Sequence, residues 1–160
     1  MFVVDTNILL YAADRDAPEH AVCRDLLLTW REQTSPWHLT WGIVYEFLRV
    51  STHRNVFRKP FISHQAWGFI QAVLASPSLS LLVETDRHET VATDVFAGVP
   101  GVGIIGNFVF DAHTAILMKE HGIATIFTRD REFRRFSFLQ VIDPLQELPD
   151  NRHSRAEEST

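Results

Sequence analysis

The stretch FVVDTNILL at residues 2–10 decides the fold class, because it changes from a strand pattern to a helical pattern at one polar turn. Residues 2–4 form a continuous apolar run, which indicates a short strand that is buried on both faces. Asp5 then opens a helical stretch that extends to about Ala13. A strand that leads directly into a helix is typical of an α/β sheet, and here an acidic side chain follows the strand.

The rest of the chain continues the alternation of helices and strands. Helices are expected at residues 18–33, 43–52, 63–74, 86–96 and 107–121, and strands at residues 37–39, 79–83, 123–127 and 141–142. This order predicts an α/β fold with a central, mostly parallel sheet of four or five strands. Residues 149–160 are polar throughout and are expected to be a disordered tail that follows a single domain at residues 1–148.

Composition limits the classes of protein to which the chain can belong. Its 160 residues are 46% hydrophobic, which is enough for one core. The one cysteine, Cys23, allows neither an internal disulfide nor a cysteine-based zinc cluster, so we expect a reducing, cytoplasmic location. No signal-like segment and no apolar run of about 18 residues is present, so no membrane association is expected.

Four acidic residues, Asp5, Glu46, Asp111 and Asp130, lie at strand ends or within apolar surroundings. Three of them also have an ordinary structural explanation: Asp5 as a helix cap, Glu46 as an acid on a helix surface and Asp130 as a turn residue. Asp111 is harder to explain in this way, because it follows an apolar stretch at residues 108–110 on the expected apolar face of a helix. A carboxylate in such a place needs a cation or several hydrogen-bond donors.

Taken together, the four acids predict a metal site. The carboxyl ends of parallel strands lie along one edge of a sheet, so Asp5 and Asp130 are expected to meet there. Helices that begin at or pass this edge would supply Glu46 and Asp111. Clustered carboxylates raise one another's pKa unless a cation neutralises them, and Mg²⁺ or Mn²⁺ prefers oxygen ligands. Ions of this kind orient phosphates and activate water, which favours phosphodiester hydrolysis.

The net charge of −5 argues weakly against a nucleic-acid partner, since phosphate contacts favour basic surfaces. Counting the four acids with a metal leaves 16 acidic side chains against 15 basic ones, so local charge matters more than the total. Zinc is not expected, because the eight histidines contain no His-Glu-x-x-His pattern. His113 is expected to have a structural or surface role.

Four ordered motifs resemble those of the PIN-domain ribonucleases, and more narrowly the VapC-type toxins of bacterial toxin–antitoxin pairs. The motifs are Val4-Asp5-Thr6-Asn7, Tyr45-Glu46, the segment from Gly106-Asn107 through Asp111-Ala112-His113-Thr114-Ala115, and Thr128-Arg129-Asp130-Arg131-Glu132-Phe133. The resemblance covers about residues 1–145. Each motif is weak alone, but the ordered set is specific.

The resemblance implies a three-layer α/β/α sandwich, usually homodimeric, that cleaves RNA, often transfer or ribosomal RNA, and is silenced by a protein antitoxin. It implies that Asp5, Glu46 and Asp111 are the principal ligands of one or two Mg²⁺ or Mn²⁺ ions, with Asp130 bound directly or through water. Asn7 and Thr128 resemble residues that orient these acids. Position 132 departs from the family pattern, because many relatives have aspartate where this chain has a longer glutamate, so Glu132 is left out of the predicted ligands.

Other readings stay open from the sequence. The chain would also fit a housekeeping RNA-processing nuclease of the same fold, or a binding module whose acids are structural or whose metal site is inactive. Arg129, Arg131 or Arg134 is expected to hold flanking phosphates. The aromatic residues Trp37, Trp41, Trp67 and Phe57 are expected mainly in the core, with one or two lining an antitoxin groove.

Overall fold

A parallel sheet forms the centre of the protein in the computed structural model, which describes residues 1–101 and 103–146. Within these residues the sheet has five strands in the order β3-β2-β1-β4-β5, and every neighbouring pair is parallel. The strands are β1 (Val3–Val4), β2 (Trp37–Thr40), β3 (Leu79–Leu82), β4 (Thr125–Phe127) and β5 (Gln140–Ile142). The helices are α1 (Thr6–Ala13), α2 (His20–Glu32), α3 (Trp41–Ser51), α4 (Ser63–Leu74), α5 (His88–Gly98) and α6 (Phe108–Glu120).

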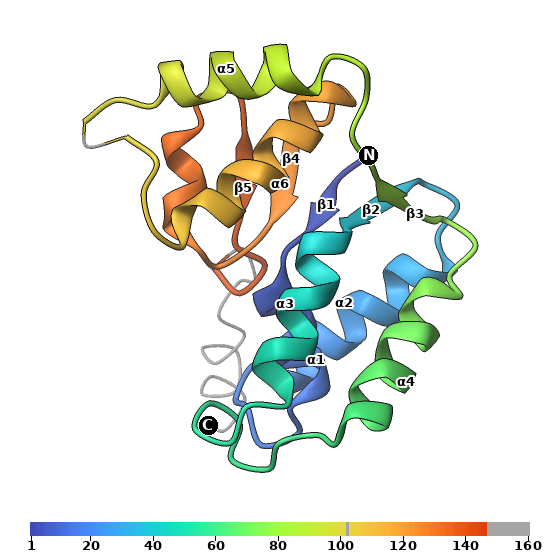
Figure 1. Ribbon diagram of the computed structural model, residues 1–160. Coiled ribbons are helices and arrows are strands. Elements are labelled where there is room, and N and C mark those ends of the chain that lie inside the picture. Colours follow the sequence, from blue (N-terminus) through green and yellow to red (C-terminus); the bar gives the residue numbers. More distant parts are fainter. Residues whose placement is uncertain (102, 147–160) are drawn as a thin grey trace, which may run out of the picture.

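The helices form two groups around this sheet (Figure 1). Helices α1–α4 gather around β1–β3, whereas α5 and α6 pack together beside β4 and β5. The chain passes from β3 through α5 and α6 to β4, and so crosses to the other side of β1. The predicted three-layer α/β/α sandwich with a parallel sheet is therefore confirmed.

Strand β1 lies in the middle of the sheet and is completely buried, as its apolar sequence predicts. Val3 pairs with His38 on one side and Ile126 on the other, and Val4 pairs with Phe127. Each aliphatic side chain buried in this way contributes about 1.5–3 kcal/mol to folding. The register places the carboxyl ends of β1 and β4 side by side, which is the position that the site requires.

Two boundaries differ from the sequence prediction. Strand β4 begins two residues later than expected, because Gly122 takes a positive φ of 67° and the Ile123 N–H donates to the Met118 carbonyl (2.9 Å), closing the end of α6. The predicted cap at Asp86 is wrong, because α5 begins at His88 after a turn closed by the Thr85 carbonyl (3.0 Å). The expected disordered tail at residues 149–160 lies outside the described residues.

A short 3-10 helix, η1 (Arg131–Arg135), was not expected from the sequence. Asp130 begins it, because its Oδ1 atom accepts a hydrogen bond from the Glu132 N–H (2.8 Å). This turn fixes both acidic residues on one short segment after β4.

Candidate metal centre

Asp5 lies at the junction of β1 and α1 and is buried, with 7% of its surface exposed. Its N–H donates to the Phe127 carbonyl (3.0 Å), so the residue still belongs to the pairing between β1 and β4. Its Oδ1 atom accepts from the Thr6 N–H (2.7 Å), which makes Asp5 the cap of α1. The capping explanation is therefore correct for one carboxylate oxygen, but it does not account for the other.

The second oxygen of Asp5 is held by the two residues that the resemblance implied as its neighbours. The Thr128 hydroxyl donates to Oδ2 (2.6 Å), and the Asn7 amide donates to the same atom (2.7 Å). Asn7 also donates to Thr128 Oγ1 (2.8 Å), which accepts a further bond from the Asp130 N–H (2.9 Å). This network fixes the Asp5 carboxylate and connects it to the segment that carries Asp130.

Glu46 and Asp111 approach Asp5 from two helices. Glu46 lies on α3, where its Oε2 atom accepts from the Thr6 hydroxyl (2.9 Å) and its Oε1 atom contacts Arg49 (3.3 Å). Asp111 lies in the first turn of α6. Asp5, Glu46 and Asp111 all line one cavity of about 590 Å³. The structure thus brings together three acids that are far apart in the sequence.

Asp130 joins this cluster through Asp111, and so does Glu132, which the sequence argument omitted. One carboxylate oxygen from each of Asp111, Asp130 and Glu132 can be chosen so that all three atoms lie within 4.8 Å of one another. The longer side chain of Glu132 therefore reaches the cluster, because η1 turns its backbone toward α6. Its place two residues after Asp130 was the signal that could have identified it.

Burial and mutual repulsion disturb the ionisation of these acids. Burial raises the pKa of Asp5 to about 6 despite its hydrogen bonds from Thr128 and Thr6, and the charges of Glu46 and Asp130 act in the same direction. The pKa of Asp111 is raised further, to about 8, first by burial and then by the charge of its acidic neighbours. Removal of water and repulsion between like charges therefore both oppose full ionisation of the protein alone.

The donor set fits a hard divalent cation. Every ligand atom that the cluster offers is a carboxylate oxygen, which is the donor that Mg²⁺ and Mn²⁺ prefer. Arg49 is the basic side chain among the residues lining the cavity, and its side chain is 69% exposed. Such an exposed cation neutralises little of the buried charge, whereas a divalent ion would favour the ionised form of each acid.

The residues around the cluster differ in their availability to a substrate. Arg129 is already paired with Glu19 (2.7 Å) and lies over the Tyr11 ring, so it is poorly placed to hold a phosphate. Two exposed aromatic residues, Tyr45 and Phe110, line the same cavity as the acids. The sequence argument did not identify Phe110, and nothing in its apolar surroundings marks it as exposed.

A second hollow, with a volume of about 870 Å³, is larger but lies elsewhere. It is bounded by the end of α1, the start of α2 and residues near α4, including Phe57, Lys59 and Phe69. None of the four predicted acids lines it. The chemistry of the lining, rather than the volume, therefore identifies the candidate site.

Comparison with known sequences gives matches along nearly all of the chain. The sequence model of the PIN domain matches residues 2–139. The VapC ribonuclease Mb2897 of Mycobacterium bovis is 36% identical over 149 residues, which cover 91% of this chain and 96% of that relative. Ribonuclease VapC48 of Mycobacterium tuberculosis is 31% identical over 140 residues, covering 88% and 94% respectively.

Comparison with solved structures supports the same fold. The Mycobacterium tuberculosis toxin VapC20, described as cleaving the sarcin–ricin loop, superposes with a TM-score of 0.62 at 19% identity. The alignment covers 89% of this chain and 100% of that one. VapBC2 from Rickettsia felis, bound to a DNA fragment from its promoter, gives a TM-score of 0.61 at 17% identity and covers 88% of this chain and 96% of that one.

Proposed function

This chain belongs to the PIN domain family, and on that premise we propose that the acidic cluster is the metal centre at which it cleaves RNA. The chain is an endoribonuclease of the VapC type, the toxin of a toxin–antitoxin pair. The observation that supports the role of the cluster is the convergence of buried carboxylates from β1, α3, α6 and the segment after β4 on one cavity edge. Folding gains nothing from such repulsion, whereas a metal centre requires it.

Asp5, Glu46, Asp111 and Asp130 are proposed as the catalytic, metal-holding residues, and Mg²⁺ or Mn²⁺ as the ion. The bound ion supplies a Lewis acid that polarises the phosphate and lowers the pKa of water. We add Glu132 as a further candidate, since its carboxylate lies within reach of Asp111 and Asp130.

The protein's own residues prepare the carboxylates for this role. Thr128 and Asn7 hold Oδ2 of Asp5 in one orientation, so the carboxylate does not have to reorganise when an ion binds. The Thr6 hydroxyl holds one oxygen of Glu46 on the side of α3 that faces α1. These contacts explain why the acids stay clustered despite their repulsion.

We propose single-stranded or loop RNA, such as transfer or ribosomal RNA, as the substrate. Tyr45 is 64% exposed and Phe110 is 69% exposed, and both side chains line the cavity beside the acids. Exposed aromatic rings stack on unpaired bases with about 1–3 kcal/mol per base. Bases held in this way would place the connecting phosphate next to the carboxylates, and the exposed Arg131 lies close by on η1.

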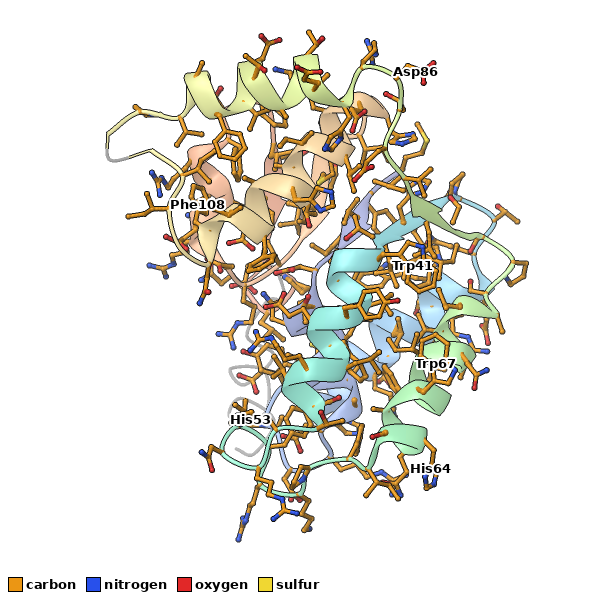
Figure 2. All side chains as sticks on the ribbon, viewed as in Figure 1. Trp41, His53, His64, Trp67, Asp86 and Phe108 are labelled. Atoms are coloured by element: carbon orange, nitrogen blue, oxygen red, sulfur yellow. The ribbon has the colours of Figure 1, made fainter. Side chains whose placement is uncertain are left out.

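A protein antitoxin and a second copy of the chain are the proposed partners. The structures that share this fold include VapBC assemblies, which supports a partner of the antitoxin class. Trp37 and Phe57 are buried as expected, but Trp41 and Trp67 are 41% and 38% exposed and lie on α3 and α4 (Figure 2). Aromatic side chains of this kind are enriched at protein interfaces, so these two residues are candidates for such contacts.

Two further expectations remain proposals. We propose that residues 1–148 act as a single nuclease domain and that the protein works in the cytoplasm. Among the described residues, no helix combines the length and the apolar character that crossing a membrane requires.

The proposed function is tested by incubating the purified chain with end-labelled single-stranded RNA and Mg²⁺. Cleavage should stop on chelation and fall about 100-fold or more in Asp111→Asn, because a metal ligand is lost. Asp94→Asn, which changes an exposed acid on α5, is the matched control and should cleave normally. Undiminished cleavage by Asp111→Asn would show that the cluster is not the active centre.

A further inference from the structure

A second group of possible metal ligands lies on the other side of α6 from η1 and contains none of the acids of the metal centre. Glu84 follows β3, His88 is the first residue of α5 and His113 lies on α6. One ligand atom from each of the three can be chosen so that all lie within 4.8 Å of one another. The two imidazole rings are 5.7 Å apart between centroids and nearly perpendicular, at 73°.

His88 is held in a defined orientation by a buried acid. Its Nδ1 atom lies 2.7 Å from Oε2 of Glu120, whose side chain is completely buried. This contact occupies Nδ1 and leaves Nε2 as the free ring nitrogen. A histidine that binds a metal through one nitrogen usually donates the other N–H to a carboxylate, which fixes the ring and makes it a stronger ligand.

Glu120 is in turn fixed by the loop that carries the other ligands. Its Oε1 atom accepts from the Thr85 N–H (3.0 Å) and from the Thr85 hydroxyl (2.6 Å), and the Arg87 guanidinium donates to the Glu120 carbonyl (2.9 Å). The loop before α5 is therefore tied to the end of α6. This arrangement holds His88 and Glu84 near His113 without requiring any of the three to bond to another.

His113 and Glu84 complete the group and leave room for solvent. His113 Nε2 lies 3.5 Å from Glu84 Oε1, and their side chains are 40% and 65% exposed. A separation of 3.5 Å is long for a hydrogen bond but suits two atoms that share an ion. An incoming ion would therefore meet two nitrogens, one carboxylate oxygen and an open position.

We propose that Glu84, His88 and His113 form a second metal site, which binds Zn²⁺ or a similar transition-metal ion with water in the fourth position. Two imidazoles and one carboxylate match the ligand preference of zinc, whereas the oxygen donors of the acidic cluster suit Mg²⁺. The sequence argument against zinc considered only a local histidine motif. The fold supplies the missing ligand, because α6 carries His113 to the start of α5.

An ion at this site would connect the loop before α5 to α6 and so restrict one wall of the nuclease cavity. His113 lines that cavity together with Asp111. The binding itself does not depend on the proposed ribonuclease activity, so it is measured separately from RNA cleavage.

The test is a titration of the metal-free full chain with Co²⁺ in the presence of excess Mg²⁺, followed by visible absorption. A four-coordinate site with nitrogen ligands gives a much stronger band than a six-coordinate oxygen site. We expect one equivalent of Co²⁺ to produce this band, Zn²⁺ to abolish it, and binding to stabilise the fold against heat. His88→Ala and His113→Ala should each lose the band while retaining the circular dichroism of the parent.

Two matched controls separate a built site from general surface binding. His64→Ala removes an exposed histidine on α4, on the opposite side of the molecule from Asp86 and the start of α5 (Figure 2), and should leave the titration unchanged. Glu120→Gln should weaken Co²⁺ binding about 10–100-fold although Glu120 does not contact the ion. Its control, Glu89→Gln, changes an exposed acid on the same end of α5 and should have no effect.

The proposal is overturned if folded His88→Ala and His113→Ala still give the band at one equivalent. It is also overturned if Asp111→Asn alone removes the band, because Co²⁺ would then occupy the acidic cluster. Retention of the band in Asp111→Asn, with its loss in both histidine variants, supports the second site even if the chain cleaves no RNA.

Discussion

Replacing Asp111 with asparagine is expected to stabilise the metal-free protein at alkaline pH while it removes metal-dependent cleavage. Burial and the neighbouring charges of Asp5, Asp130, Glu46 and Glu132 raise the pKa of Asp111 from its ordinary value of 3.8 to about 8. The folded state thus opposes an ionisation that the unfolded chain undergoes freely. Asparagine keeps the shape of the side chain and removes the charge.

The sign and size of the effect follow from this pKa. Because the folded pKa is raised, the favourable contribution of Asp111 is complete below about pH 4 and is lost as the pH rises through about 8. A tenfold change in acid dissociation constant corresponds to about 1.4 kcal/mol, so the upper limit of the loss at about pH 9 is about 6 kcal/mol. Water entry and relaxation reduce this limit, and we expect asparagine to recover about 2 kcal/mol or more.

The assay is urea unfolding in the presence of a chelator at about pH 4.5 and about pH 9. Asp111→Asn should exceed the parent in stability by a margin that grows with pH, whereas Asp94→Asn should follow the parent at both values. Added Mg²⁺ should stabilise the parent and not the variant, since only the parent retains the ligand. A variant that is no more stable than the parent at about pH 9 would refute the account of Asp111 as a repelled, metal-ready acid.

Three further outcomes are expected from the same cluster. Binding of Mg²⁺ should release about one proton per chain near pH 7, mainly from Asp111, and almost none near pH 9.5; calorimetry in buffers of different ionisation enthalpy measures this, and release that does not vary with pH would contradict it. Thr128→Val removes the 2.6 Å hydrogen bond to Asp5 and should lower the free energy of unfolding by about 1–3 kcal/mol, with unchanged urea midpoints as the contrary result. Glu132→Gln should weaken metal binding about tenfold, less than Asp111→Asn does, and affinity equal to that of the parent would remove Glu132 from the ligand set.

Much of the fold was predictable because its signals are local. The apolar run before Asp5 and the change to helical periodicity after it predict β1 and α1 within a residue of their observed bounds. The strand order was not predictable in the same way, because it depends on how α5 and α6 cross the sheet. That crossing places β4 next to β1 and makes Thr128 a neighbour of Asp5.

The parts of the candidate site that the sequence argument missed depend on contacts between distant segments. Glu132 was left out because of its length, but the 3-10 turn that begins at Asp130 brings its carboxylate to Asp111. His88 and His113 carry no joint sequence motif, and only the packing of α5 on α6 places them together. Periodicity describes one element at a time, so such meetings become visible only in three dimensions. The roles of the four acids as ligands stay predictions.

Anomalous diffraction from crystals of the chain grown with Mn²⁺ tests the central claim most directly. The account predicts a manganese peak at the carboxyl ends of β1 and β4, with carboxylate oxygens of Asp5 and Asp111 at about 2.0–2.3 Å or bridged to it by water. The same crystals of Asp111→Asn should lose the peak. A peak that is absent from this cluster in the parent, or that persists unchanged in Asp111→Asn, would contradict the assignment of these acids as the metal centre.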